Sequence, residues 1–248
     1  MVDTVIESMK MDTVNRIPLI DVHTHLLPGI DDGARNIGES ESMYRMLLSQ
    51  GVEKILLTPH FYSDKMPIDR FLDERRIAYE TLLNSPEIDS SKVILASETL
   101  FSQSILSYDN IKELCINGKY LLIEFPFETE FSKHVCSQLM RISYQYGVTP
   151  ILAHVERYPY LMRHTNVLSS LIDDGMLTQI NLASLQTFRK RRRIIRLIRK
   201  GYIHLIGTDC HHPFNRPPAF EEGLSILRKH LSDDEINDLL QNAWDIIN

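Results

Sequence analysis

The sequence predicts an α/β fold in which parallel strands, each followed by helical or loop material, form a barrel. Short apolar segments alternate with amphipathic segments along most of the 248 residues, and this length is common for a single α/β barrel. Seven strand units favour a barrel over an open sheet. No linker, repeat or low-complexity segment interrupts the pattern. We therefore expect one domain at residues 17–248, preceded by an N-terminal extension at residues 1–16.

Seven short apolar segments are the expected strands. Proline follows two of them directly, as Pro59 and Pro126, and proline cannot donate a hydrogen bond to a neighbouring strand. Strands buried on both faces contain nearly continuous apolar runs, which fits a parallel sheet covered by helices. The expected strands are residues 17–22, 54–58, 93–96, 120–125, 150–153, 177–182 and 202–207.

Segments with one apolar face separate these strands and are the expected helices. In residues 39–50, Met43 and Leu47 lie on the apolar face, and Asn36 with Glu39 can form a capping box. Glycine ends several of the segments, as Gly51 does here. The other expected helices are residues 69–84, 132–146, 166–174, 185–200, 219–230 and 233–247.

Composition excludes several function classes. The net charge of −6 gives no general attraction to nucleic acid or to an anionic membrane. No apolar run approaches the roughly 20 residues of a membrane span, and the first 16 residues do not resemble a signal peptide. Three scattered cysteines do not suggest a disulfide framework. We expect a cytoplasmic protein that neither inserts into a membrane nor binds nucleic acid.

Side chains that can bind metal follow six of the seven expected strands. His23 and His25 stand at positions i and i+2, which face the same side at the end of a strand. The carboxyl ends of parallel barrel strands share one rim, where active sites form. Each residue alone is more often a satisfied polar group, but the repetition favours one metal centre. The candidate ligands are His23, His25, Asp32, His60, Glu98, Glu124, His154, Asp209 and His211.

This set combines imidazole nitrogen with carboxylate oxygen and exceeds the needs of one ion. Without metal, we expect the carboxylates to raise each other's pKa, and divalent cations would relieve that repulsion. The mixture suits Mn, Fe, Zn or Mg more than a structural zinc site. Neighbouring ions that share a carboxylate are used to cleave phosphate esters. Arg157 and Arg216 lie in the same rim loops, and arginine binds phosphate oxygens well, although each alone is as often a surface ion pair.

Several motifs in this order resemble the polymerase and histidinol phosphatase (PHP) superfamily. The closest similarity is to its bacterial tyrosine-protein phosphatases of capsule and exopolysaccharide synthesis. The resemblance covers nearly all of the chain after residue 17, and it implies a distorted (β/α)7 TIM-like barrel, the PHP fold, with a metal site at the C-terminal rim of the strands. The motifs are Asp-x-His-x-His at 21–25 with Asp31-Asp32-Gly33 behind it, Leu-Ile-Glu-Phe at 122–125, Ala-His-x-Glu-Arg-Tyr at 153–158, Asp-x-His at 209–211 and Arg216-Pro217-Pro218.

The resemblance also implies a site for up to three ions, most often Mn2+, with Fe, Zn, Mg or Co as alternatives. Arg157 and Arg216 would hold the phosphate, and Asp32 would contribute to catalysis. The implied ligand groups are His23, His25, Glu98 and Asp209 for one ion, Glu98, Glu124 and His154 for a second, and Asp32, His60 and His211 for a third.

The implied function is that of a metal-dependent protein-tyrosine phosphatase whose partner is a phosphotyrosine-bearing protein, the tail of a bacterial capsule tyrosine kinase. Water activated by metal would attack phosphorus directly, without a covalent phospho-enzyme. Alternatives are a histidinol-phosphate phosphatase, a nuclease or a non-catalytic metal-binding regulatory module. The acidic balance argues against the nuclease, and the complete ligand set with two arginines argues against the inert module.

The expected helix at 185–200 is strongly basic. Eight of the chain's 27 lysines and arginines fall within residues 189–200. A solvated helix face is the simpler interpretation. The alternative is a docking surface for an acidic, phosphorylated tyrosine tail.

Cys210 and Arg216 have the C-x5-R spacing of cysteine-dependent tyrosine phosphatases. The loop between them lacks glycine, and Pro213 removes one amide donor, so it is poorly suited to surround an anion. In a strand-like segment Asp209 and His211 would share one face, and Cys210 would point away from the metals. We therefore expect Cys210 to be a packing residue.

Overall fold

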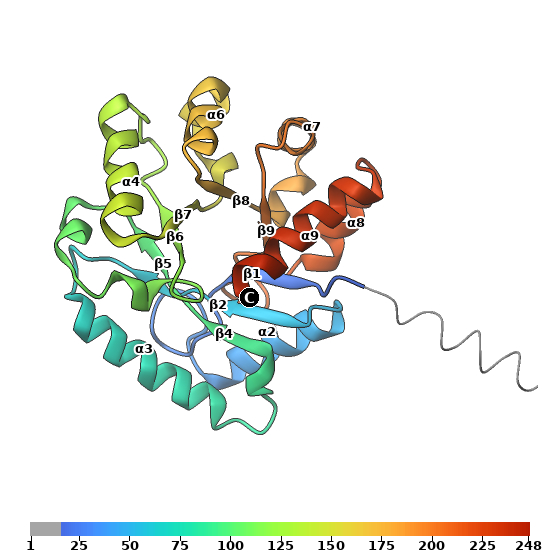
Figure 1. Cartoon of the computed structure of the whole chain (residues 1–248). Helices are drawn as coiled ribbons and strands as arrows, with labels where there is room; N and C mark the ends of the chain where they lie inside the picture. The colour runs from blue at the N-terminus through green and yellow to red at the C-terminus, as the bar shows by residue number, and fades with distance from the viewer. Residues whose placement is uncertain (1–15) are drawn as a thin grey trace, which may run out of the picture.

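The computed structural model describes residues 16–248, and at its centre lies a curled sheet of short parallel strands (Figure 1). Two runs of paired strands make up the sheet, and every pair is parallel. The first run is β1 (Ile20–Thr24), β2 (Lys54–Leu57) and β4 (Val93–Leu95). The second is β3 (His60–Phe61), β5 (Glu98–Leu100), β6 (Tyr120–Glu124), β7 (Thr149–Leu152), β8 (Leu177–Asn181) and β9 (Leu205–Gly207).

The first and last strands are neighbours. Thr24, at the end of β1, forms a parallel bridge with Cys210, just after β9. The backbone N–H of Asp209 donates to the carbonyl of His23 at 2.8 Å, and that of His25 donates to the carbonyl of Cys210 at 3.0 Å. These bonds bring the polar residues that follow β1 and β9 together.

Two of the predicted strands are each followed, after a break of two residues, by a second short strand that was not predicted. Only Thr58 and Pro59 separate β2 from β3, and only Ala96 and Ser97 separate β4 from β5. Upstream of each break β2 pairs with β4, and downstream of it β3 pairs with β5. The short downstream strands carry His60 and Glu98, and their register places these two residues opposite each other.

Helices form the outer layer around the sheet (Figure 1). The α-helices are α2 (Ile37–Ser49), α3 (Ile68–Leu83), α4 (Lys133–Tyr146), α5 (Pro159–Arg163), α6 (Thr165–Asp173), α7 (Phe188–Ile198), α8 (Phe220–Arg228) and α9 (Asp233–Ile247). Short 3-10 helices are η1 (Ser90–Lys92), η2 (Gln103–Ser107), η3 (Ile111–Leu114), η4 (Val155–Arg157) and η5 (Leu182–Gln186).

Several helix predictions differ in detail from the structure, and α5 was not predicted. The predicted helix at 185–200 is shorter, because Leu185 belongs to η5 and α7 begins at Phe188. The side chain of Asn36 caps α2 by accepting from the backbone N–H of Glu39, as predicted. A capping box also requires the Glu39 carboxylate to accept from the backbone N–H of Asn36. This part of the prediction is wrong, because the carboxylate accepts from the backbone N–H of Arg35 at 2.9 Å instead.

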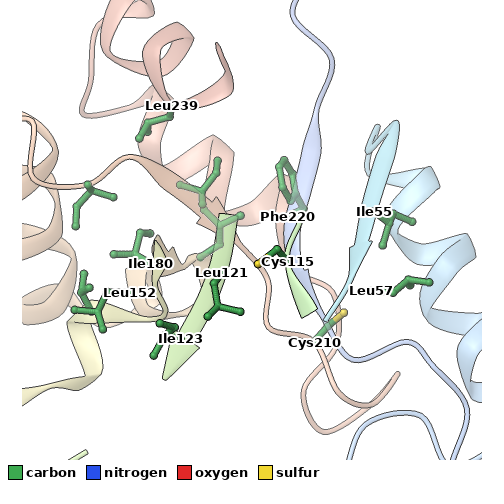
Figure 2. Close-up of a cluster of buried hydrophobic side chains, with 14 of the residues drawn as sticks. Ile55, Leu57, Cys115, Leu121, Ile123, Leu152, Ile180, Cys210, Phe220 and Leu239 are labelled. Atoms are coloured by element: carbon green, nitrogen blue, oxygen red, sulfur yellow. The ribbon is translucent and has the colours of Figure 1, made fainter. Parts of the chain in front are cut away.

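The sheet separates two apolar clusters. Alternate residues along a strand face opposite sides, so Ile55 and Leu57 of β2 pack in the outer cluster, whereas Leu56 packs in the inner one. Figure 2 shows part of the outer cluster, including Leu121 and Ile123 of β6. The inner cluster combines residues of both runs of strands and of the loops between elements with Ala243 and Ile246 of α9. A shared inner core of this kind fits a sheet that curls on itself.

Most of the expected N-terminal extension, residues 1–15, lies outside the described residues, which begin at Arg16. Within residues 16–248, none of the helices combines the length and the apolar character that a membrane crossing requires.

Candidate metal centre

The fold brings the nine candidate ligands together at the carboxyl ends of the strands. Three overlapping groups have ligand atoms within 4.8 Å of one another. These groups are His23 with His25, Glu98 and Asp209; His60 with Glu98 and Glu124; and His25 with His60 and His211. The first group contains the four residues expected to bind one ion. The other two differ in membership from the expected groups, because His60 and His25 take the places of His154 and Asp32.

His154 and Asp32 adjoin these groups. His154 Nε2 lies 2.9 Å from Glu98 Oε1 and 3.6 Å from Glu124 Oε2. Asp32 Oδ1 lies 3.5 Å from His60 Nε2 and 3.6 Å from His211 Nε2. The Asp32 side chain is 70% exposed, so it stands at the solvent edge of the cluster.

Glu98 is the centre of the cluster and is completely buried. Its Oε2 atom lies 3.0 Å from His23 Nε2, 3.3 Å from His25 Nε2 and 3.2 Å from His60 Nδ1. The His23 and His25 Nε2 atoms also face each other at 3.2 Å. Nitrogen and oxygen atoms that converge at this spacing without intervening groups are arranged as ligands of a shared cation.

Several of these atoms lack the hydrogen bonds that burial demands. Among residues 16–248, Glu98 Oε2, His60 Nδ1 and His211 Nε2 are buried and have no hydrogen-bond partner. Buried polar atoms without partners are rare and costly in a folded protein. All three point into the cluster, so bound cations would satisfy them, and the residues present fit metal ions.

Neighbouring histidines control the ionisation of the buried carboxyls. Burial alone would raise the pKa of Glu98, but the neighbouring imidazoles of His23, His154 and His25 hold it well below its usual range. The pKa of Glu124 is also lowered, by His154 and His60 against the effect of burial. Glu98 still raises the pKa of Glu124, as expected of neighbouring carboxylates, but the histidines outweigh this effect. In return, Glu124 and Glu98 raise the pKa of His154 to about 10, against the effect of burial.

Asp31 orients two of the candidate ligands. Its Oδ2 atom lies 2.7 Å from His25 Nδ1 and accepts from the backbone N–H of His60 at 3.0 Å, while its Oδ1 accepts from the N–H of Gly33 at 2.9 Å. Burial would raise the pKa of Asp31, but His25 holds it well below its usual range. Outer carboxylates of this kind fix the ring and tautomer of a ligating histidine. The Asp31-Asp32-Gly33 motif contained this residue, but a role was predicted only for Asp32.

Gln179 was not predicted and supports the other side of the cluster. Its Oε1 atom lies 3.3 Å from His23 Nδ1 and accepts from the backbone N–H of His154 at 2.8 Å. His154 itself has a positive φ of 33°, which is uncommon for a residue with a side chain. Gln179 lies in the middle of a mostly buried strand, and only its polarity at a buried position could have marked it.

Asp209 connects the cluster to both arginines. Its Oδ1 faces His25 and His23 at 3.4 and 3.6 Å. Its Oδ2 lies 3.0 Å from Arg157 Nη2 and 2.7 Å from Arg216 Nη2, and it accepts from Asn181 Nδ2 at 2.6 Å. The arginine side chains are 32% and 40% exposed, so they are accessible from solvent next to the cluster. Asp209 has a positive φ of 54°, a strained backbone of the kind found at functional sites.

A pocket of about 430 Å³ opens over the cluster. Both arginines line it, together with candidate ligands and the aromatic residues Tyr62 and Phe127. Phe127 is 44% exposed, and the Arg157 guanidinium carbon lies 5.8 Å from the centre of its ring. The pocket therefore has a polar floor, cationic groups at one side and aromatic rings.

Cys210 is a packing residue, as predicted. Figure 2 shows its side chain beside β1 and β2 within the outer apolar cluster. Burial raises the pKa of its thiol far above the range in which a thiolate nucleophile forms at neutral pH. The predicted reason was only partly right, because the left-handed backbone of Asp209 interrupts the strand-like alternation.

Comparison with known proteins places the chain in a group of bacterial phosphatases. Residues 19–248 match the family described as "Capsular polysaccharide synthesis, CpsB/CapC". The chain is 29% identical over 244 residues to the tyrosine-protein phosphatase YwqE of Bacillus subtilis, which covers 91% of this chain and 90% of that protein. It is 25% identical over 242 residues to the tyrosine-protein phosphatase CpsB of Streptococcus agalactiae, which covers 92% and 98%.

Solved structures agree with this placement. The structure superposes with a TM-score of 0.75 on a crystal structure from a study of B. subtilis YwqE and Streptococcus pneumoniae CpsB, described as "unique metal-dependent tyrosine phosphatases", at 25% identity and over 92% and 94% of the two chains. A phosphotriesterase homology protein from Escherichia coli superposes with a TM-score of 0.51 at 12% identity, over 94% and 98% of the chains. That second match reflects the fold alone, a mixed α/β fold with a curled parallel sheet.

Proposed function

Since the chain belongs to the CpsB/CapC family of capsular polysaccharide synthesis, we propose that it is a metal-dependent protein-tyrosine phosphatase. The observation that carries this proposal is the convergence of three imidazole nitrogens on the buried Glu98 carboxylate, beside Asp209 and the two arginines that contact it. No low-pKa cysteine competes for the role of nucleophile at this site, since Cys210 is buried outside it.

We propose three ions, with Mn2+ as the most suitable, held by overlapping sets of ligands. Metal at such a site lowers the pKa of water and neutralises the charge on phosphoryl oxygens. The proposed ligands are His23, His25, Glu98 and Asp209 for one ion, Glu98, Glu124 and His154 for a second, and Asp32, His60 and His211 for a third.

Arg157 and Arg216 bind the phosphoryl oxygens of the substrate. Each guanidinium places one nitrogen on Asp209 Oδ2, which leaves its other N–H donors free to point toward the pocket. Charge that builds on phosphoryl oxygens in the transition state is stabilised by donors fixed in this way. Asp32, at the exposed edge, would accept the proton that the attacking water loses, and solvent at the same edge would protonate the leaving oxygen.

The aromatic walls of the pocket suit an aryl phosphate. Tyr62 stacks on His60 with ring centres 5.1 Å apart, and Phe127 meets the ring of His154 edge-on at 5.8 Å. A phosphotyrosine ring can contact these rings while its phosphate lies over the cluster. A shorter phosphoserine would have to bring its backbone into the pocket to reach the same depth.

We also propose the number of barrel units, the natural substrate and the cellular compartment. Counting β2 with β3 and β4 with β5 as broken strands gives seven units, a distorted (β/α)7 TIM-like barrel formed as one domain by residues 17–248. The substrate is the phosphotyrosine tail of a bacterial tyrosine kinase that acts in capsule or exopolysaccharide synthesis. The free cysteines Cys115, Cys136 and Cys210 fit a reducing compartment, the cytoplasm.

The test is turnover of four substrates by the Mn2+-loaded protein. A phosphotyrosine peptide should be hydrolysed with the highest kcat/KM, ahead of a phosphoserine peptide, histidinol phosphate and a single-stranded oligonucleotide. His23→Ala should lower kcat by orders of magnitude, whereas His134→Ala, which removes an exposed histidine of α4, should not. Preferred hydrolysis of histidinol phosphate or of the oligonucleotide would replace this proposal with one of the alternatives, and a protein inert toward all four would favour the regulatory module.

A further inference from the structure

A second hollow adjoins the active-site pocket. It has a volume of about 590 Å³ and lies between α5 and α7. Phe127 and Arg157 line both the hollow and the pocket, so the two adjoin at these side chains. We call this hollow the α5–α7 groove; its lining is Phe127, Glu156, Arg157, Pro159, Met162, Arg163, Arg189, Lys190, Arg193 and Ile194.

The α5–α7 groove is strongly cationic. Arg163, Arg189, Lys190 and Arg193 are exposed, and within residues 16–248 none of them forms an ion pair. The groove contains one acidic residue, Glu156, which is buried. Its Oε1 accepts hydrogen bonds from the backbone N–H of Asn181 and from Ser184 Oγ. Unpaired positive charge therefore accumulates beside the site of a chain whose net charge is −6.

The basic helix has two different faces. Arg189 and Arg193 are one turn apart and line the α5–α7 groove. Arg192 and Arg196, also one turn apart, line a separate hollow with Phe188 and His230 that shares no lining residue with the active-site pocket. Figure 1 shows α7 in the outer layer between α6 and α8, and arginines of both faces are exposed. Of these two faces, the one with Arg189 and Arg193 is therefore the one that adjoins the active-site pocket.

We propose that the α5–α7 groove binds an acidic segment that flanks the phosphotyrosine in the substrate polypeptide. This inference rests on the proposed phosphatase function and adds a substrate class to it, phosphotyrosine next to Asp or Glu residues. Charge complementarity selects the occupant, because four unpaired cations face carboxylates in such a segment. Pro159 supplies exposed apolar surface for the peptide backbone, with the buried Met162 and Ile194 beneath it, and Arg157 connects the phosphate to the flanking residues.

The interaction is electrostatic, and its range is set by salt. The Debye length is about 8 Å at physiological ionic strength, so exposed cations act mainly on groups that reach the groove. Two exposed charge pairs are expected to change binding about three- to tenfold. A docked flank would raise kcat/KM through tighter binding and faster encounter, with little change in kcat.

The test compares two peptides that share one phosphotyrosine, flanked either by glutamates on both sides or by serines on both sides. The readout is the ratio of their kcat/KM values at low and at high salt. In the wild-type enzyme the ratio should be about three to ten at low salt and approach one at high salt. Arg189→Glu with Arg193→Glu should bring the low-salt ratio to one or below. The matched control, Arg192→Glu with Arg196→Glu, reverses the same number of charges on the same helix and should preserve the ratio.

A second readout separates this inference from the proposed function. Fluorescence anisotropy of the glutamate-flanked peptide measures binding whether or not the peptide is hydrolysed, and it should show a several-fold loss of affinity for the 189/193 variant alone. An equal loss of affinity in both double variants would mean general charge attraction and would overturn the proposal that the groove binds the acidic flank. A ratio near one in wild type, with normal turnover of the serine-flanked peptide, would also overturn it and leave the phosphatase function intact. Loss of all turnover with groove-dependent binding retained would instead overturn the function.

Discussion

Replacing Asp31 with asparagine should weaken metal binding without unfolding the protein. Asp31 accepts three hydrogen bonds, from His25 Nδ1 and the backbone N–H of His60 at Oδ2 and from the N–H of Gly33 at Oδ1. With His25 Nε2 directed at the cluster, His25 Nδ1 carries its hydrogen. An amide in the place of this carboxylate must therefore turn its NH2 group toward at least one of these donors.

The cost of that mismatch can be estimated from the geometry. The cheaper orientation keeps the amide oxygen on His25 and His60 and places the NH2 group against Gly33, which leaves a buried donor unpaired at about 1–3 kcal/mol. The variant also loses the negative charge that makes the His25 ring more basic. Loss of a carboxylate partner behind a ligating histidine typically costs 10- to 100-fold in metal affinity or activity, and we expect Asp31→Asn to fall in that range.

The assay is a Mn2+ titration in competition with a chromophoric chelator, followed by kcat/KM for a phosphotyrosine peptide at each metal concentration. Asp31→Asn should need about 10- to 100-fold more metal for half-maximal activity, and excess metal should restore part of the rate. Asp73→Asn, which removes the same charge from the exposed face of α3, should match wild type. Wild-type metal affinity in Asp31→Asn would refute the view that this carboxylate positions His25.

Three further predictions follow from single residues. Burial raises the pKa of Asp21 from 3.8 to about 6. The protonated carboxyl therefore favours the folded state, and its full contribution to the free energy of unfolding of metal-free protein is present below about pH 4. It falls by about 3 kcal/mol as the pH rises to 6; Asp21→Asn should lack that fall in denaturant unfolding series, and identical pH profiles would contradict it. Cys210→Ser should keep most of the phosphotyrosine activity; an inactive variant with its full metal content would point to cysteine chemistry. Arg216→Ala should lower kcat/KM at least tenfold, with metal content by elemental analysis unchanged, and wild-type kinetics would argue against phosphate binding by this arginine.

The sequence predicted the parts of the site that depend on local geometry. His23 and His25 could be placed together because residues at i and i+2 face the same side of a strand, and the ends of parallel strands share a rim. The broken strands were not predicted, because β3 and β5 have two and three residues and show no periodicity. Each of them nonetheless carries a central residue of the cluster, His60 or Glu98.

Residues that support the ligands were harder to predict, because their contacts join positions far apart in the sequence. Gln179 contacts His23 from 156 positions away, and nothing within its own strand indicates that partner. The left-handed backbone of Asp209 likewise depends on tertiary hydrogen bonds, such as that from its N–H to the carbonyl of His23. Among the eight basic residues at 189–200, the sequence could not separate those beside the active site from those on the other face of α7.

The most direct test of the metal mechanism is to measure activity and bound metal on the same samples as the ions are removed and restored. Stripped protein in excess chelator should retain its fold and lose hydrolysis of the phosphotyrosine peptide. Activity should return in proportion to bound metal, best with Mn2+, and Cys210→Ser should follow the same curve. Full hydrolysis by protein in which elemental analysis detects no bound metal would contradict the account.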